Sequence, residues 1–192
     1  EPMNRYTKSV AALAAIAAVA LSGCAHAAQR EAKYLQRGKV QVAAGDYEKA
    51  RLEFQNALQI DPKNVDAQFQ LAEVQEKLQN WRAAAGGYQA VIEAEPRHVG
   101  AKTRLARLLL LAGQTDAAKK MIDEAAAIAP QDAGVHTIEG AIAARRGDTA
   151  TALKEVQTAL AADPGQLDGI MLLASLYEKQ GKTQDAERTL QD

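Results

Sequence analysis

The sequence predicts an all-α protein built as a stack of antiparallel helix pairs, and two observations lead to this prediction. The chain of 192 residues contains 42 alanines, more than a fifth of the total, and only 4% aromatic residues. Alanine is the strongest helix former and a poor strand former. The second observation is an internal period of 34 residues. A fixed period in this range is typical of a solenoid, in which stacked neighbours bury the apolar face that one unit leaves open.

Three residue types mark the period. Four of the five prolines follow one another at intervals of 34 residues, at Pro62, Pro96, Pro130 and Pro164. Glycines recur at the same interval at Gly45, Gly113, Gly147 and Gly181. At the equivalent position of the second unit, glycine is replaced by Gln79. Alanine recurs without exception at Ala50, Ala84, Ala118, Ala152 and Ala186. Because proline cannot continue a helix, each proline fixes the turn into the next unit.

This punctuation resembles the tetratricopeptide repeat (TPR), a pair of antiparallel helices. The first unit carries the family pattern at Tyr34, Gly38, Gly45, Tyr47, Ala50, Phe54, Ala57 and Pro62. The resemblance implies a right-handed superhelix of about four and a half repeats. The units are expected at 31–64, 65–98, 99–132, 133–166 and, incompletely, 167–192. Later units follow the pattern less well, and Glu139 takes a position that is usually apolar.

The small residues of the pattern have a packing role. Gly38 and the recurring alanines are expected to let the two helices of a unit approach each other, because larger side chains would overpack the contact. Phe54 and Tyr88 are expected to fill the space beside them, and Trp81 is likewise expected to belong to the core. Asp46 and Asp148 follow turn glycines, where an N-cap is needed.

The first 23 residues differ in composition from the rest. After Glu1 and Pro2, which we interpret as a remnant, a short basic stretch precedes a continuous apolar run over 10–21. This run is too short for a membrane-spanning helix, which needs about 20 residues. The order of basic stretch, apolar run and small residues predicts a secretory signal peptide over 1–23.

The end of this segment resembles the lipobox of bacterial lipoproteins. Leu21-Ser22-Gly23 precedes Cys24, the chain's single cysteine. The resemblance implies cleavage before Cys24, lipidation of its thiol, and a short tether over 24–30. In this family, a residue such as Ala25 after the lipidated cysteine is typical of lipoproteins at the outer membrane. The resemblance therefore implies an outer-membrane protein that faces the periplasm. The alternative is an ordinary signal peptide in which the cysteine occurs by chance.

Composition and motifs argue against several other function classes. The formal net charge of −1 lacks the surplus of Lys and Arg that nucleic-acid binding needs, so no nucleic-acid partner is expected. The three histidines, His26, His98 and His136, are not at the spacing of a catalytic triad or a metal site. Phosphate-binding motifs are also missing, and Gly86-Gly87 is expected to weaken a helix rather than bind a ligand. We therefore expect no enzyme, cofactor or metal.

The surface expected to act is the concave groove. In TPR proteins it is lined by positions 2, 5, 9, 12 and 13 of each first helix. Leu35, Phe69, Leu110 and Leu111 together with Lys39, Glu73 and Arg107 would then form a partly apolar, partly charged groove. Such a groove suits an amphipathic helix or an extended peptide. The alternative is a solvated face whose charges pair with one another.

Two functions remain open. The first is a membrane-anchored scaffold that helps to assemble or secrete an envelope structure. The segments 30–35 and 45–51 look like those of lipoproteins that accompany exosortase and exopolysaccharide systems, and pilus-biogenesis lipoproteins are the next candidate. The second is a docking or regulatory region of a larger enzyme whose catalytic domain lies beyond residue 192.

The C-terminal end lacks a polar capping helix. Leu173, Leu176, Tyr177 and Leu190 would leave an apolar end open to water. We expect either a longer array or a cover supplied by a partner or by another copy of the chain.

Overall fold

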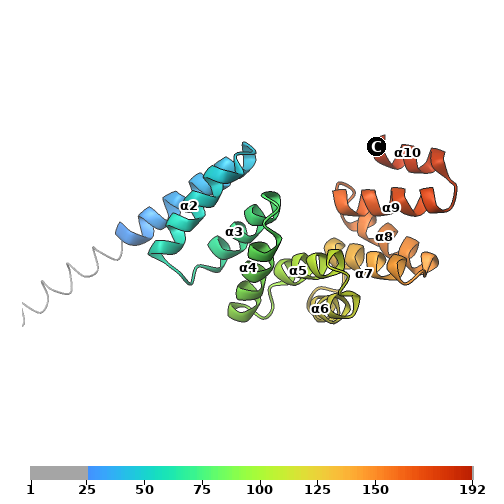
Figure 1. Cartoon of the computed structure of the whole chain (residues 1–192), viewed down its shortest axis with the longest axis horizontal. Coiled ribbons are helices and arrows are strands. Elements are labelled where there is room, and N and C mark those ends of the chain that lie inside the picture. Colours follow the sequence, from blue (N-terminus) through green and yellow to red (C-terminus); the bar gives the residue numbers. More distant parts are fainter. Residues whose placement is uncertain (1–25, 192) are drawn as a thin grey trace, which may run out of the picture. The chain divides into compact units, whose positions relative to one another are not determined.

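The computed structural model describes residues 26–191 as a succession of helices joined by short turns (Figure 1). No strand occurs among these residues, so the predicted all-α class is confirmed. The predicted signal peptide and Cys24 lie outside the described residues. A helix covers residues 26–43 and is followed by α2 (Tyr47–Ile60), α3 (Val65–Lys77), α4 (Trp81–Ala94), α5 (Val99–Leu111), α6 (Thr115–Ile128), α7 (Ala133–Arg145), α8 (Thr149–Ala162), α9 (Leu167–Lys179) and α10 (Thr183–Gln191).

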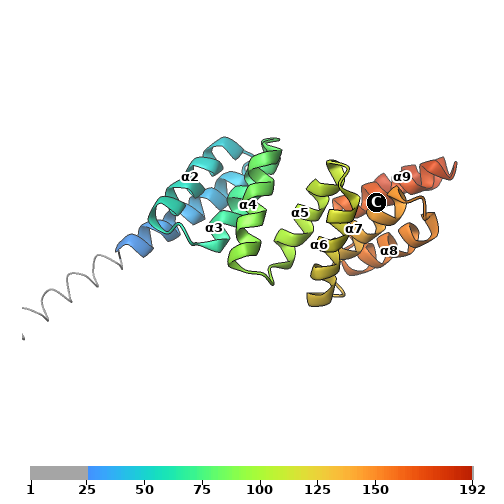
Figure 2. The same cartoon turned by 60° about the horizontal axis from the view of Figure 1, so that its bottom comes forward.

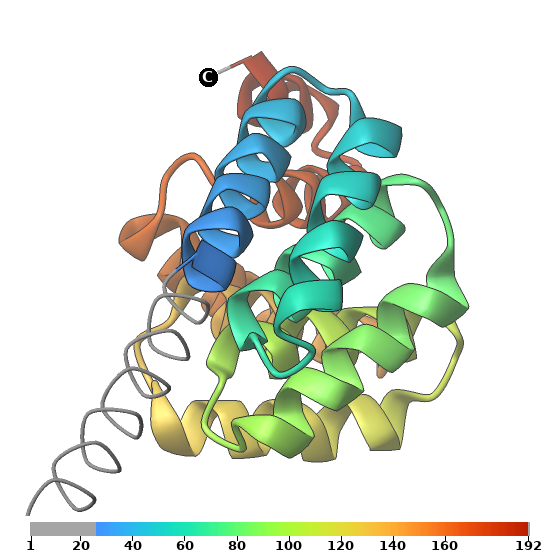
Figure 3. The same cartoon turned by 90° about the vertical axis from the view of Figure 1, so that its left-hand side faces the viewer.

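The chain divides into two compact units between Ala84 and Ala85, inside α4. The first unit contains the helix over 26–43, α2 and α3, which can be followed from blue to cyan in Figure 3. The second contains α5 to α10, in which each of α5, α7 and α9 packs against the helix that follows it. Within the described part of the chain, every helix is too short or too polar to cross a membrane.

The turns inside the helix pairs explain the periodic glycines. Gly45, Gly113, Gly147 and Gly181 have φ between 74° and 82°, a left-handed conformation that costs a residue with a side chain about 1–2 kcal/mol. Gln79, which replaces glycine in the second repeat, adopts the same conformation with φ 60°. The backbone N–H after each of these residues bonds back to a carbonyl five residues earlier, as in Asp46 N to Gln41 O at 2.9 Å. This is the Schellman arrangement that ends a helix.

The starts of the helices are capped by polar side chains. As predicted, Asp46 and Asp148 accept backbone N–H bonds at the starts of α2 and α8. Asp132 does the same for α7, at 2.9 Å from Val135 N. His98 caps α5 through Nδ1, at 3.0 Å from Ala101 N, a role that the sequence analysis did not predict. Gln114 at the start of α6 makes no such bond.

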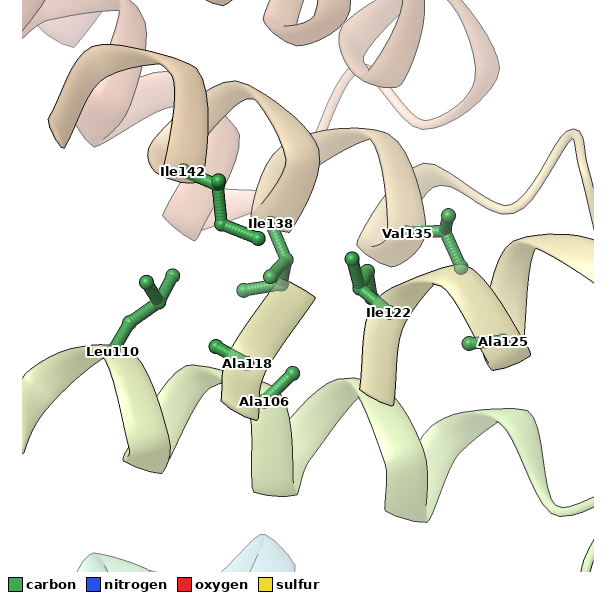
Figure 4. Close-up of a cluster of buried hydrophobic side chains, with 8 residues drawn as sticks. All are labelled: Ala106, Leu110, Ala118, Ile122, Ala125, Val135, Ile138 and Ile142. Atoms are coloured by element: carbon green, nitrogen blue, oxygen red, sulfur yellow. The ribbon is translucent and has the colours of Figure 1, made fainter. Parts of the chain in front are cut away.

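The recurring alanines lie in the core, as predicted. Ala50, Ala84, Ala118 and Ala152 are fully buried, and Ala186 is 2% exposed. Large side chains pack beside them, and Phe54, Tyr88, Ile122 and Val156 are also fully buried. In the second unit, Figure 4 shows how α5, α6 and α7 contribute to one cluster, whose members are Ala106, Leu110, Ala118, Ile122, Ala125, Val135, Ile138 and Ile142.

Gly38 shows how tightly the first pair is packed. A β-carbon added there would lie 2.4 Å from Phe54 Cε1, well inside van der Waals contact. Gly140, at the matching position of a later repeat, is also closely packed, and a β-carbon there would lie 3.2 Å from the backbone oxygen of Ala152. The predicted need for small residues at these crossings is confirmed.

Trp81 departs from the sequence prediction. It was expected in the core, but it is 48% exposed. The reason is its place as the first residue of α4, where no preceding helical turn covers it. Tyr47, the first residue of α2, is half-buried for the same reason.

Among the described residues of the second unit, one charged side chain is buried. Lys102 on α5 is 4% exposed and its Nζ lies 2.6 Å from Glu124 Oε2 on α6. A buried ammonium needs such a partner, because removing one member of a buried pair leaves an uncompensated charge. The pair therefore ties α5 to α6.

Two glycine substitutions of the same kind should have opposite effects on stability. We expect Gly38→Ala to destabilise the fold by about 1–3 kcal/mol, because the new methyl group clashes with Phe54. We expect Gly86→Ala to stabilise it by about 1 kcal/mol, because the space around Gly86 is open and alanine is the better helix former. Urea unfolding followed by circular dichroism measures both changes. Equal effects of the two variants would contradict this packing.

The uncapped start of α6 allows a stabilising change. The backbone of Gln114, with φ −88° and ψ 63°, resembles that of the capping Asp46, with φ −87° and ψ 74°. We expect Gln114→Asp to raise the free energy of unfolding by about 1 kcal/mol, because its carboxylate can accept an N–H of the first turn. Gln114→Ala is the control and should leave the stability nearly unchanged. A Gln114→Asp variant no more stable than this control would contradict the capping argument.

Candidate functional site

A cavity of about 330 Å³ opens among three helices of the second unit. These helices are α5, α7 and α9, of which α7 packs against both of the others (Figure 2). The cavity is lined by Arg107, Leu110, Leu111, Thr137, Ile138, Ala141, Ala144, Arg145, Asp168, Leu172 and Lys179. Its volume is at the lower end of the range of ligand pockets, about 300–1,000 Å³.

The lining is apolar at the base and charged at the edge. Leu110 and Ile138 are 6% and 4% exposed and belong to the core cluster, whereas Leu111 is 64% exposed. Thr137, also nearly buried, has its hydroxyl within hydrogen-bond distance of two acceptors, Ala133 O at 2.9 Å and Gln166 Oε1, to one of which it donates its proton. Its polar atom is therefore satisfied without a ligand, and the base of the cavity offers mainly an apolar surface.

The charges at the edge are predominantly positive. Arg107, Arg145 and Lys179 line the cavity together with one carboxylate, that of Asp168. Arg107 Nε lies 3.9 Å from Asp168 Oδ2, which joins α5 to α9 across α7. The cavity lining carries a surplus of positive charge.

The repeat period explains why these residues meet. The first helices α3, α5, α7 and α9 begin at residues 34 apart, from Val65 to Leu167. Counted from these starts, every lining residue except Ile138 and Leu172 occupies position 2, 5, 9, 12 or 13. These are the positions from which the groove was predicted. The structure thus brings the predicted Arg107, Leu110 and Leu111 to one cavity.

Leu110 differs in role from its neighbour. In the run of four leucines from Leu108 to Leu111, Leu111 is the exposed residue. Leu110 instead packs with Ala118 and Ile142 in the core, so only part of its side chain faces the cavity. A substitution at Leu110 would therefore change stability as well as the surface.

The other predicted groove residues lie in the first unit and are considered separately. Leu35 is half-buried and packs against the cluster of Ala50, Phe54 and Val74. Lys39 Nζ lies 2.8 Å from Asp66 Oδ2, with about half of each side chain exposed. Phe69 and Glu73 are half-buried on α3. Within each unit one such pair, Lys39–Asp66 in the first and Arg107–Asp168 in the second, agrees with the alternative in which the predicted groove charges pair with one another.

A polar cluster on the other side of α7 was missed by the sequence prediction. His136 Nδ1 lies 2.8 Å from Glu155 Oε2 on α8 and 3.7 Å from Glu139 Oε2 on α7. Burial, together with the negative charge of Glu155, raises the pKa of the Glu139 carboxyl above its usual value. The cluster joins one histidine to two glutamates, so the spacing between histidines does not reveal it. The sequence signal that could have indicated it is His136 and Glu139, three residues apart on one helix.

Comparisons with solved structures agree with the described fold. The chain is 25% identical to TTC0263, a TPR protein of Thermus thermophilus, with a TM-score of 0.74 over 83% of this chain and 87% of that one. It is 20% identical to PilF of Pseudomonas aeruginosa, with a TM-score of 0.67 over 85% and 75% of the two chains. It is 18% identical to YrrB, described as a TPR protein with an unusual peptide-binding site, with a TM-score of 0.57 over 82% and 81%.

Family models account for most of the described chain. The model described as TPR repeat matches residues 38–79, and the model described as tetratricopeptide repeat matches residues 79–142 and 143–192. No curated protein matches the sequence significantly. Because the second family model alone covers more than half of the residues, the chain belongs to the tetratricopeptide repeat family.

Proposed function

We propose that the chain is a non-catalytic scaffold that binds a protein partner through the cavity between α5, α7 and α9. The observation that carries the proposal is the combination of an apolar base with exposed Leu111 and basic side chains at one opening. Small-molecule and peptide sites usually have this composition, with a few polar groups around an apolar surface. YrrB, which shares the fold, is described as having a peptide-binding site, and this supports a similar use of the fold here.

The size of the cavity limits what it can take. A volume of about 330 Å³ suits one large apolar side chain or one turn of a peptide better than a whole cofactor. The remaining contacts would come from the exposed parts of α5, α7 and α9. The partner is therefore a longer segment, such as an amphipathic helix, that places one anchor residue in the cavity.

The charge of the cavity selects among such segments. Three cations and one carboxylate line it, and Asp168 is already close to Arg107. A partner with carboxylates next to its apolar anchor is favoured, because like charges brought together at an interface cost several kcal/mol. The proposed ligand is thus an acidic amphipathic peptide.

The proposal also covers the location of the chain in the cell. The lipobox-like sequence supports lipidation of Cys24, which would hold the repeats at the periplasmic face of a bacterial outer membrane. Each acyl CH₂ buried in the bilayer contributes about 0.8 kcal/mol, so two or three chains form a durable anchor. The scaffold would assist an envelope structure, either an exopolysaccharide or exosortase system or a pilus. The likeness to PilF concerns the fold alone.

Peptide binding can be measured with two short fluorescein-labelled peptides that share a leucine-rich helical core. One carries glutamates beside the core and the other carries lysines. We expect the acidic peptide to bind more tightly, and we expect Arg145→Glu to weaken its binding about tenfold, or about 1.4 kcal/mol. Ala141→Trp should also weaken it by filling the cavity. Fluorescence polarisation at several salt concentrations gives the affinities.

The matched control is Arg97→Glu, which reverses an exposed charge outside the cavity lining. It should leave the affinity unchanged apart from a small long-range effect that salt screens. Circular dichroism checks that Ala141→Trp remains folded. Equal binding of both peptides, no binding of either, or an equal loss in the Arg97→Glu control would contradict the proposed site.

Membrane anchoring is tested by fractionation of a bacterial host that produces the full chain. We expect the unmodified chain to stay in the membrane fraction after carbonate washing and Cys24→Ser to move to the soluble fraction, because serine cannot accept the thioether-linked lipid. Ala28→Ser, a small change downstream, is the control and should stay with the membranes. A Cys24→Ser chain that remains bound after washing would contradict the anchor.

A further inference from the structure

We infer that His136, Glu139 and Glu155 form a binding site for one divalent transition-metal ion, with Zn²⁺ as the best match. One donor atom from each residue lies within 4.8 Å of the other two. This grouping brings together two helices, since His136 and Glu139 belong to α7 and Glu155 belongs to α8. The inference is independent of the proposed peptide site.

The distances are close to those that a metal would impose. Zn²⁺ binds imidazole nitrogen and carboxylate oxygen at about 2.0–2.2 Å, so two ligands of a tetrahedral site lie about 3.4 Å apart. The observed separations of His136 Nδ1 from Glu155 Oε2 and Glu139 Oε2 are 2.8 Å and 3.7 Å. The donor atoms of all three residues lie within 4.8 Å of one another, so side-chain rotations without a backbone change would bring them around one ion. Three protein ligands leave the fourth position for water.

The surroundings also favour a cation. The side chains of His136, Glu139 and Glu155 are 15%, 27% and 16% exposed, so two carboxylates face each other in a mostly buried place. The charges facing them from α6 are those of Lys119 and Asp123, which form an ion pair with each other. Lys154 Nζ is 4.0 Å from Glu155 Oε1 and its side chain is 79% exposed.

A second observation concerns the imidazole. His136 Nε2 is buried and has no hydrogen-bond partner among the described residues. A histidine kept only as a hydrogen-bonded packing residue would normally have both nitrogens satisfied. The unsatisfied Nε2 shows that His136 is not a fully hydrogen-bonded packing residue, and Nδ1 is the nitrogen that lies beside the two carboxylates.

The repeat pattern shows that the cluster is specific to one unit. Thirty-four residues earlier, the positions of His136, Glu139 and Glu155 are held by Lys102, Leu105 and Met121. Leu105 is buried, as expected at a packing position. The fourth repeat thus replaces two apolar residues with carboxylates beside a histidine. An imidazole with carboxylates suits Zn²⁺ and related ions, whereas Mg²⁺ and Ca²⁺ prefer oxygen ligands alone.

The cluster is separate from the peptide cavity. Successive residues of an α-helix are rotated by about 100°, which places His136 and Glu139 on one side of α7 and the cavity residues Thr137, Ile138 and Ala141 on another. Metal binding and peptide binding can therefore be measured independently. Failure of one would leave the other unaffected.

The test is titration of the full chain with ZnCl₂ by isothermal calorimetry, after treatment with EDTA and desalting. We expect one Zn²⁺ per chain, and a rise in the thermal unfolding midpoint when it binds. Glu139→Gln should weaken binding at least about tenfold, because even residues that only support metal ligands change affinity about 10- to 100-fold. Substitution by Co²⁺ should give the visible absorption of a four-coordinate site, and Glu139→Gln should abolish it.

Control variants separate this site from other metal-binding groups. His26→Gln and Glu187→Gln remove an exposed histidine and an exposed glutamate elsewhere, and neither should change Zn²⁺ affinity. Glu139→Gln relieves the repulsion between two carboxylates, so it is expected to stay folded even if His136→Gln does not. Absence of one-to-one binding, or binding that Glu139→Gln and Glu155→Gln leave unchanged, would overturn the inference. The cluster would then be a hydrogen-bonded group of side chains.

Discussion

The close contact between the two helices of each repeat is the constraint on which the described structure depends. It requires a small residue on one helix and a large apolar residue on the other, as in Gly38 against Phe54. The alanines that recur every 34 residues are buried in every described repeat. An extra methyl group at such a contact costs about 1–3 kcal/mol of stability, so the contact positions tolerate few residue types. Freedom remains at positions outside this contact, where the residues of the proposed binding cavity lie.

Regular packing also creates the candidate binding surface. Because α5, α7 and α9 present equivalent positions, residues about 34 apart in sequence line one opening. Small residues on α7 leave room there, while Arg107, Arg145 and Lys179 supply charge. The backbone geometry is thus common to the repeats, and the chemistry comes from the residues that differ between them. The His136 cluster arises in the same way, because one repeat carries polar residues at positions where the preceding repeat is apolar.

Much of the fold could be predicted because its determinants are local. Proline and glycine at fixed spacing indicated the helix pairs, and Gln79, an exception to the glycine pattern, keeps the turn conformation with φ 60°. Trp81 was placed wrongly because exposure at the first turn of a helix depends on what lies outside the helix. The cavity was anticipated only through positions taken from the family resemblance. The meeting of Glu155 with His136 depends on the rotation of α8 against α7, which sequence spacing alone does not fix.

The buried Lys102 has a consequence for experiments on this chain. Its side chain is 4% exposed and its amine is paired with Glu124, whereas the side chains of Lys39, Lys49 and Lys154 are 47%, 68% and 79% exposed. Acylating reagents require a neutral, accessible amine, so the accessible lysines would be modified first. Resistance of Lys102 to such reagents would therefore report directly on the integrity of the α5–α6 hairpin.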